Sequence, residues 1–243
     1  FSLSVNVAAS GYTLTAAAAG LPNVESVAFE VIVGPASHVD FQTRPHDEIA
    51  GGTLGSPYIQ LRAEDTGGNL VTSFTGLVTV AIAANPGGGT LSGATTVAAV
   101  GGLATFSDLS IDKVGTGYTL SFSADGLLGV TSATFNITPA AASRLVFTVQ
   151  PTSTAAAATI TPAVEVTAWD TFGNVATGFA GNVTLAIGSN PGRGTLGGTA
   201  SVAAVAGVAT FASLSINNAG VGYTLVAGAG GLAGATSVTF DIN

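Results

Sequence analysis

The chain contains a long internal repeat. Residues 63–138 align without a gap with residues 168–243, at an offset of 105, and 44 of the 76 aligned positions are identical. A period of about 105 residues is too long for the unit of a solenoid and matches a small domain that buries its own core. The repeat therefore predicts tandem copies of one domain rather than one larger fold.

The repeat divides the chain into three segments. Residues 35–138 and 139–243 are two complete copies, whereas residues 1–34 match only the last third of a copy. The matching pieces are Leu3-Ser4-Val5 with Leu109-Ser110-Ile111, and Gly11-Tyr12-Thr13-Leu14 with Gly117-Tyr118-Thr119-Leu120. We expect residues 1–34 to be the C-terminal part of an incomplete domain. Its missing strands belong either to a longer array or to another copy of the chain.

Composition excludes several classes of function. The chain has no cysteine, so disulfides and thiolate metal sites are not available. Five basic residues against thirteen acidic ones give a net charge of −8, and nucleic-acid binding needs clustered cations instead. No run of about eighteen apolar residues occurs, so the sequence predicts no membrane insertion.

The charge content is unusually low, at 7% of residues against about 25% in a typical soluble domain. One explanation is a surface covered by neighbouring subunits or repeats. The other is a coat of Thr, Ser and Asn that suffices alone. Composition leaves both explanations open.

Alternating apolar residues predict β-strands throughout the chain. Val78–Ile82 and Val183–Ile187 place apolar residues at every second position. Clusters of Gly, Asn and Pro divide each copy into about seven short strands, the signature of an immunoglobulin-like sandwich. The alanine-rich tracts at 16–19 and 155–158 are short, so we predict no helix there. The predicted fold class is all-β, with tandem immunoglobulin-like β-sandwiches.

The same alternation predicts the core of each copy. In the first copy the expected core residues are Phe41, Leu61, Phe74, Phe106, Leu109, Tyr118 and Phe135. In the second copy they are Phe147, Val166, Phe179, Phe211, Leu214, Tyr223 and Phe240.

Three short motifs recur in both complete copies. They are Asp-x-x-Gly-Asn (65–69, 170–174), Gly-Thr-Leu (89–91, 194–196) and Gly-x-Ala-Thr-Phe (102–106, 207–211). With these motifs the chain resembles bacterial immunoglobulin-like repeats, which stack in invasin- and intimin-like adhesins and other very large secreted proteins. The resemblance implies an extracellular or cell-surface location and a structural or adhesive role.

One dense charge cluster interrupts the polar surface of the first copy. It contains Arg44, His46, Asp47 and Glu48, and the second copy has Pro151–Thr154 at the same place. A His/Asp/Glu group can hold a metal or supply two members of a catalytic triad. Because the cluster lies in a segment between strands, a solvated loop is favoured, followed by a contact surface. Metal binding and catalysis come last.

The repeated Asp–Asn loops are weak candidates for calcium binding. Asp65 and Asn69 in the first copy, and Asp170 and Asn174 in the second, offer side-chain oxygens. Calcium takes six to eight oxygen ligands, and each loop motif supplies one carboxylate. A structural turn, in which Asp accepts backbone hydrogen bonds, is therefore favoured. We predict no catalytic residue, no cofactor and no metal requirement.

These patterns favour a structural, non-enzymatic segment of a bacterial secreted or cell-surface protein, forming a stalk or fibre. One alternative is a self-assembling filament or sheath subunit completed by strands from a neighbouring chain. The other is an adhesive module that binds glycan or a host receptor through residues 44–48. The expected partners are neighbouring repeats or other copies of the chain, and then a glycan or host surface.

Overall fold

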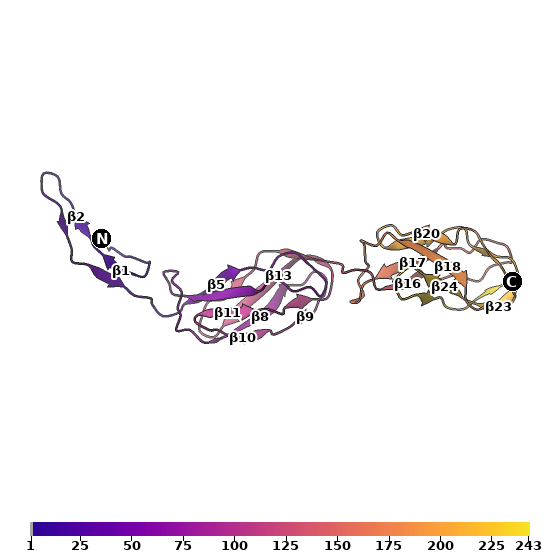
Figure 1. Cartoon of the computed structure of the whole chain (residues 1–243), viewed down its shortest axis with the longest axis horizontal. Coiled ribbons are helices and arrows are strands. Elements are labelled where there is room, and N and C mark those ends of the chain that lie inside the picture. Colours follow the sequence, from indigo (N-terminus) through magenta and orange to yellow (C-terminus); the bar gives the residue numbers. More distant parts are fainter. Residues whose placement is uncertain (1) are drawn as a thin grey trace. The chain divides into compact units, whose positions relative to one another are not determined.

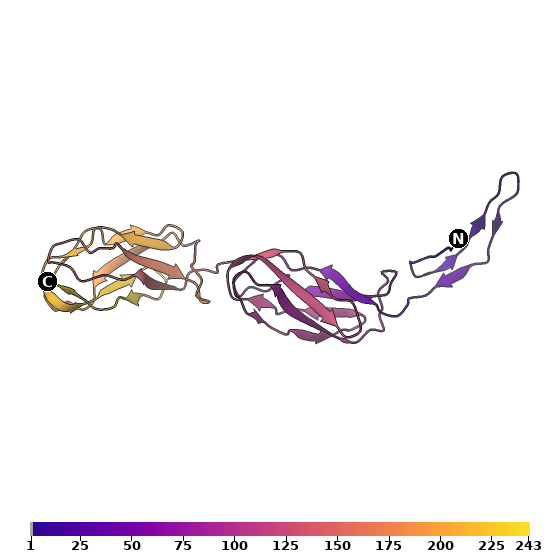
Figure 2. The ribbon, with the colours of Figure 1, turned by 180° about the vertical axis from the view of Figure 1, so that it is seen from behind.

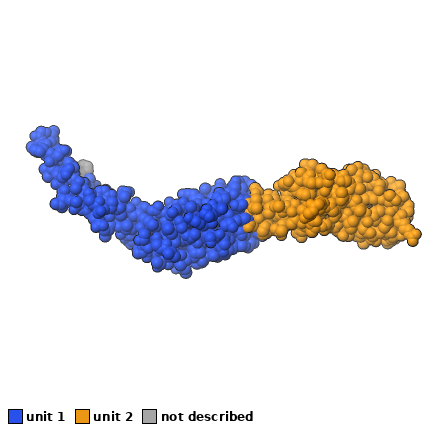
Figure 3. Space-filling view, in the orientation of Figure 1, with its two compact units in different colours: residues 1–48, 52–137 blue, residues 49–51, 138–243 orange. Residues whose placement is uncertain are grey.

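The structure, a computed structural model, describes residues 2–243. The chain divides into two compact units, one formed by residues 1–48 and 52–137 and the other by residues 49–51 and 138–243 (Figure 3). Residues 2–243 contain strands and turns but no helix, which confirms the all-β prediction. The alanine-rich tracts at 16–19 and 155–158 are non-helical, as expected. Within these residues there is accordingly no helix that could cross a membrane.

The first complete copy consists of two packed sheets (Figure 1). Its strands are β5 (His38–Thr43), β6 (Glu48–Ile49), β7 (Ile59–Glu64), β8 (Leu77–Ala84), β9 (Leu91–Ser92), β10 (Thr96–Ala98), β11 (Leu103–Phe106), β12 (Ser110–Ile111), β13 (Gly115–Ala124), β14 (Val130–Thr131) and β15 (Phe135–Thr138). One sheet has the order β10-β8-β13-β15-β6 with β14 also on β13, and the other has the order β11-β7-β5. Strands β9 and β12 form a small separate ladder. Within residues 38–138, seven strands are three residues or longer, as expected.

The second complete copy repeats this arrangement (Figure 2). Its strands are β16 (Arg144–Val149), β17 (Val164–Trp169), β18 (Asn182–Ile187), β19 (Leu196–Gly197), β20 (Ser201–Ala203), β21 (Val208–Phe211), β22 (Ser215–Ile216), β23 (Gly220–Tyr223), β24 (Leu225–Gly228), β25 (Ala235–Thr236) and β26 (Phe240–Ile242). The sheets have the orders β16-β17-β21 and β20-β18-β24-β25, and β23-β26 and β19-β22 form separate ladders. Strands β23 and β24 correspond to the single strand β13 of the first copy.

The core of each copy lies between its sheets. The alternation along β18 buries Val183 and Leu185, whose neighbours along the strand face solvent. Twelve of the fourteen predicted core residues are buried. The prediction was wrong for Phe74 and Phe179, which are only half-buried. They belong to the loops before β8 and β18 rather than to strands, and their rings lie over Gly76 and Gly181. Phe179 also packs against the core of the second copy from its margin.

Residues 9–31 form a two-stranded hairpin ahead of the first sandwich. Strand β1 (Ala9–Tyr12) pairs with β4 (Phe29–Val31), and β2 (Thr15–Ala16) pairs with β3 (Val24–Glu25). Both views show a single ribbon of two strands with no second layer over it (Figures 1 and 2). The hairpin therefore lacks a core of its own.

Candidate functional site

The Asp–Asn loop of the first copy is a tightly bonded turn that follows β7. The Asp65 side chain is buried, and its Oδ1 accepts hydrogen bonds from the backbone N–H groups of Gly67 and Asn69, both at 2.9 Å. The Asn69 amide donates to both carboxylate oxygens at 3.0 Å. This is the bonding by which Asp fixes a turn around its own backbone. The prediction of a structural turn agrees with this geometry.

The same loop also holds the chain that enters the sandwich. The backbone N–H of Gly34 donates to Asp65 Oδ2 at 2.8 Å. The Asn69 side chain donates to the carbonyl of Asn6 at 2.7 Å and accepts from the N–H of Ala8 at 2.8 Å. Two side chains of one turn thus fix both the linker and the segment before β1. Sequence reasoning missed this role, because nothing in a turn motif specifies a donor about thirty residues away.

The second copy builds the same turn around Asp170, which is fully buried. Asp170 accepts hydrogen bonds from the N–H groups of Phe172 at 2.9 Å and Asn174 at 2.8 Å, and from the Asn174 amide at 2.9 Å. The linker donor is the N–H of Ala140, at 3.2 Å. The register of the two copies places Ala140 at the position of Gly34. Three residues further on, the N–H of Ser37 donates to the Glu64 carbonyl and that of Ser143 donates to the Trp169 carbonyl. The contact to the incoming backbone is kept although the linker sequence differs.

These hydrogen bonds keep both carboxylates ionised. The N–H of Asn69, then that of Gly34 and the Asn69 side chain, lower the pKa of Asp65 to about 2. Burial raises the pKa of Asp170, but the hydrogen bonds from Asn174, Ala140 and Phe172 outweigh it, so that this pKa also lies below its usual value. The turn is thus an anchor in which a fixed negative charge binds several N–H dipoles.

The four weak calcium candidates come together in pairs, Asp65 with Asn69 and Asp170 with Asn174. N–H groups occupy the positions around each carboxylate where a cation would have to approach. Among residues 2–243, no three His, Asp or Glu side chains gather closely enough to hold a metal ion.

Within the charged loop, Asp47 fixes the backbone. Its carboxylate accepts from the N–H of Asn136 at 2.7 Å and from the Asn136 amide at 3.1 Å, which ties the loop to β15. In the second copy Ser153 Oγ accepts from the N–H of Asp241 at 2.9 Å. Since Asp241 aligns with Asn136, a hydroxyl replaces a carboxylate at the same structural position. The charge of Asp47 is therefore not what this position requires.

The other residues of the charged loop differ in their surroundings. The guanidinium of Arg44 lies 5.0 Å from the centre of the Phe41 ring. His46 Nδ1 lies 2.9 Å from the carbonyl oxygen of Asp47, and Glu48 begins the short strand β6. Arg44 and His46 are exposed. Within this group, His46 and Asp47 are in contact with each other.

A second charged group, which sequence reasoning missed, lies across β5 and β7. Glu64 contacts His38 Nε2 at 3.2 Å and Arg62 Nε at 2.7 Å. At the same cross-strand position of the second copy, the Arg144 guanidinium lies 5.3 Å over the Trp169 ring. The register of β5 against β7 would have indicated this contact, because His38 lies directly opposite Glu64 in the ladder. The two copies thus have different charged contacts at the same pair of positions.

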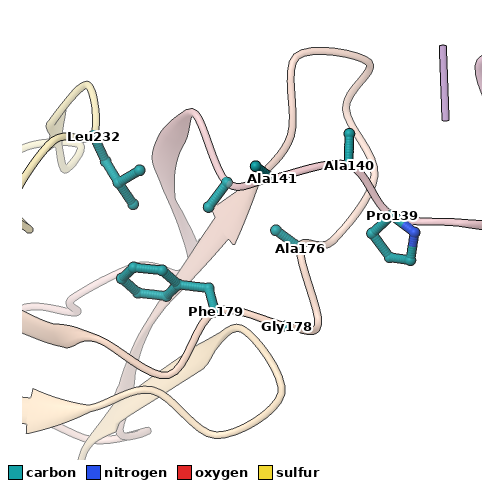
Figure 4. A pocket seen from close by; sticks show the side chains of 8 residues that line it. Pro139, Ala140, Ala141, Ala176, Gly178, Phe179 and Leu232 are labelled. Carbon is teal, nitrogen blue, oxygen red and sulfur yellow. The ribbon is translucent and has the colours of Figure 1, made fainter. Parts of the chain in front are cut away.

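The second copy also contains an open pocket of about 350 Å³ beside its linker (Figure 4). The lining residues are Pro139, Ala140, Ala141, Ala142, Ala176, Gly178, Phe179 and Leu232. The Phe179 ring and the Leu232 side chain form its apolar wall (Figure 4). None of the lining side chains titrates, so they supply no general acid, base or nucleophile.

No protein-family model and no curated protein sequence matches the chain. Among solved structures it is similar to the Yersinia pseudotuberculosis adhesin InvE, with 22% identity over 84% of this chain and 58% of that chain, at a TM-score of 0.36. It is similar to domains 4–9 of the surface layer protein SbsC, with 16% identity, 92% and 34% coverage, and a TM-score of 0.34. It is also similar to a β-glycosidase from Bacteroides vulgatus, with 12% identity over 86% of this chain and 25% of that chain, at a TM-score of 0.37.

The chain thus spans between a quarter and three fifths of the length of these structures. Similarity at this level says nothing of function. The strand order and the buried cores described above define the fold: the chain is an all-β protein that contains tandem immunoglobulin-like β-sandwiches.

Proposed function

We propose that the chain is a structural, non-enzymatic segment of a bacterial secreted or cell-surface protein, in which tandem sandwiches form a stalk or fibre. The observation that carries the proposal is the linker contact present in both copies. Asp65 holds the N–H of Gly34, and Asp170 holds the N–H of Ala140. A linker bonded to the sandwich that it enters is stiffer than a free one. Proline adds to this stiffness, because it restricts the preceding residue to extended conformations.

The mechanism is mechanical. Each sandwich resists extension through its ladders of backbone hydrogen bonds and its packed core. The aspartate turn joins the linker to this resistant body at one point, so that a load on the linker passes to the sheet next to it. This role requires no cleft with reactive groups.

Cleavage of the linker by a protease tests the hydrogen bond from the Gly34 N–H to Asp65, which we call the linker clamp. In Asp65→Ala we expect a non-specific protease to cut residues 32–36 at least about tenfold faster than in the native chain, because the Gly34 N–H loses its acceptor. Asp125→Ala is the matched control, since it removes the same charge from an exposed turn that follows β13. Equal cleavage of the two variants would show that the clamp does not stiffen the linker, and the stalk proposal would lose its support.

A self-assembling filament is the second candidate, and the exposed hairpin favours it. Leu14 is 48% exposed and Val24 is 67% exposed. Apolar strands without partners invite pairing with another chain. Sedimentation and electron microscopy of the purified chain separate the candidates, because a chain that stays monomeric at all concentrations is not a filament subunit.

An adhesive module is the third candidate, through the exposed Arg44 and His46 of the charged loop. Replacing residues 44–48 with Pro151–Thr154 of the second copy should then abolish binding to a glycan array or to host cells. Unchanged binding would remove the loop as the contact surface.

A further inference from the structure

The hairpin at residues 9–31 reproduces the last strands of a complete copy pair for pair. Each of the three ladders has the same irregularity next to its tyrosine. The corresponding pairs are Ala9↔Val31 and Tyr12↔Phe29 in the hairpin, Gly115↔Ile137 and Tyr118↔Phe135 in the first copy, and Gly220↔Ile242 and Tyr223↔Phe240 in the second. The hairpin has therefore reached the register of a complete domain without the rest of that domain.

Its side-chain hydrogen bonds are the same as well. The Tyr12 hydroxyl donates to the carbonyl of Val7, five residues earlier, at 3.0 Å. The N–H of Leu14 donates to Ser26 Oγ at 2.9 Å. The equivalent bonds are Tyr118–Lys113 and Tyr223–Asn218, both 2.9 Å, and Leu120–Ser132 and Leu225–Ser237, at 3.0 and 2.9 Å. Backbone and polar contacts thus agree in all three places.

Burial is what differs. Leu14 is 48% exposed, whereas its equivalents Leu120 and Leu225 are fully buried. Leu3 is 86% exposed, and its equivalent Leu109 is fully buried. We call this surface the hairpin face, and it consists of Leu3, Val5, Tyr12, Leu14, Phe29 and Val31. All six positions are apolar and are buried in both complete copies.

The complete copies show what covers this face. In the first copy, β8 pairs with the edge of β13 that does not face β15, with Ile82 opposite Leu120. The second sheet contributes Phe41 and Phe106, whose rings meet Phe122 edge-on at 5.3 and 5.4 Å. Phe122 lies two residues beyond Leu120 on the same buried face of β13, so the sheet that covers Phe122 lies over this face. Among residues 2–243, the strand pairings include no such partner for the edge of β2. The hairpin therefore offers an open backbone edge next to an apolar face.

We propose that the hairpin face is a docking surface for the front strands of a repeat of this chain's own type. The occupant is a polypeptide with the strand pattern of residues 36–106, which brings an edge strand like β8 and a covering sheet like β11-β7-β5. A second copy of the chain fits the surface less well, because its own front strands already cover its own β13 and β24. The edge strand of the occupant would pair with the open backbone edge of the hairpin, and its covering sheet would bury the apolar hairpin face.

The test supplies the occupant by fusion. Residues 139–211 are joined to the N-terminus of the full chain, because residue 1 aligns with residue 212. Amide hydrogen exchange is followed in residues 9–16 and 24–31. A two-stranded ribbon alone is marginally stable, so we expect fast exchange in the native chain and exchange slowed by roughly 100-fold or more in the fusion. Unchanged exchange in the fusion would overturn the proposal.

Two variants of the fusion locate the contact. Leu14→Asp places a charge on the hairpin face and should restore fast exchange. Ala17→Asp is the control, because the aligned Ser123 is exposed in the first copy. The proposal is wrong if the two variants behave alike. It is also wrong if the native chain sediments as a dimer with residues 9–31 already protected, since a second copy would then be the occupant.

Discussion

At the scale of single residues, the aspartate anchors make stability depend on pH. The pKa of Asp65 is about 2 in the folded chain, below its ordinary value of 3.8, so the folded chain favours the ionised form. The resulting stability is fully present above about pH 4 and is lost as the pH falls through 2. We expect the thermal midpoint of the first unit to fall over this range, and calorimetry against pH measures it.

Asp65→Asn is the control for this titration, because it removes the ionisable group and keeps the size of the side chain. Its midpoint should depend less steeply on pH between 4 and 2 than that of the native chain. Identical pH profiles would show that Asp65 is not the titrating anchor.

The hydroxyl group of Tyr223 contributes to the stability of the second unit. Tyr223 is fully buried and donates to the carbonyl of Asn218 at 2.9 Å. Tyr223→Phe should lower the free energy of unfolding of the second unit by about 1 kcal/mol, because one hydrogen bond is lost. The single tryptophan, Trp169, lies in that unit, so its fluorescence during denaturant unfolding gives the measurement. Tyr12→Phe, in the exposed hairpin, should leave this transition unchanged.

At the scale of elements, the glycine-dense turn after β18 depends on one close approach. A Cβ on Gly192 would overlap the carbonyl oxygen of Ala219 and the hydroxyl of Tyr223. Gly192→Ala should therefore destabilise the second unit by roughly 1–3 kcal/mol. Gly230→Ala meets nothing within 4 Å and should change stability little, which makes it the matched control. The same fluorescence transition compares the two variants, and equal effects would refute the role of close approach.

The strands and loops also show which structural features could be predicted from the sequence. Alternation predicted the buried positions of β18, because the period of a strand is local information. It misplaced Phe74 and Phe179, since their burial depends on a loop and a neighbouring glycine rather than on strand period. The linker clamp was not predictable either, because the motif shows that Asp65 caps a turn but not that Gly34 reaches it.

At the scale of the whole molecule, the second unit carries a core of its own, drawn entirely from residues 145–242. Residues 138–243 expressed alone should therefore fold and unfold cooperatively. In thermal unfolding followed by Trp169 fluorescence, the midpoint of this fragment should lie within a few degrees of the midpoint in the full chain. A fragment without a cooperative transition would mean that the repeat is not an independent folding unit.

The aspartate turn binds its linker through a main-chain N–H, a group that every residue except proline carries. The two linkers already differ in sequence, yet Gly34 and Ala140 supply the same main-chain donor at the same position. Linker sequences can therefore diverge freely while the attachment persists. Repeats joined in this way are interchangeable, so that length and surface chemistry can change by recombination without a redesign of the joints.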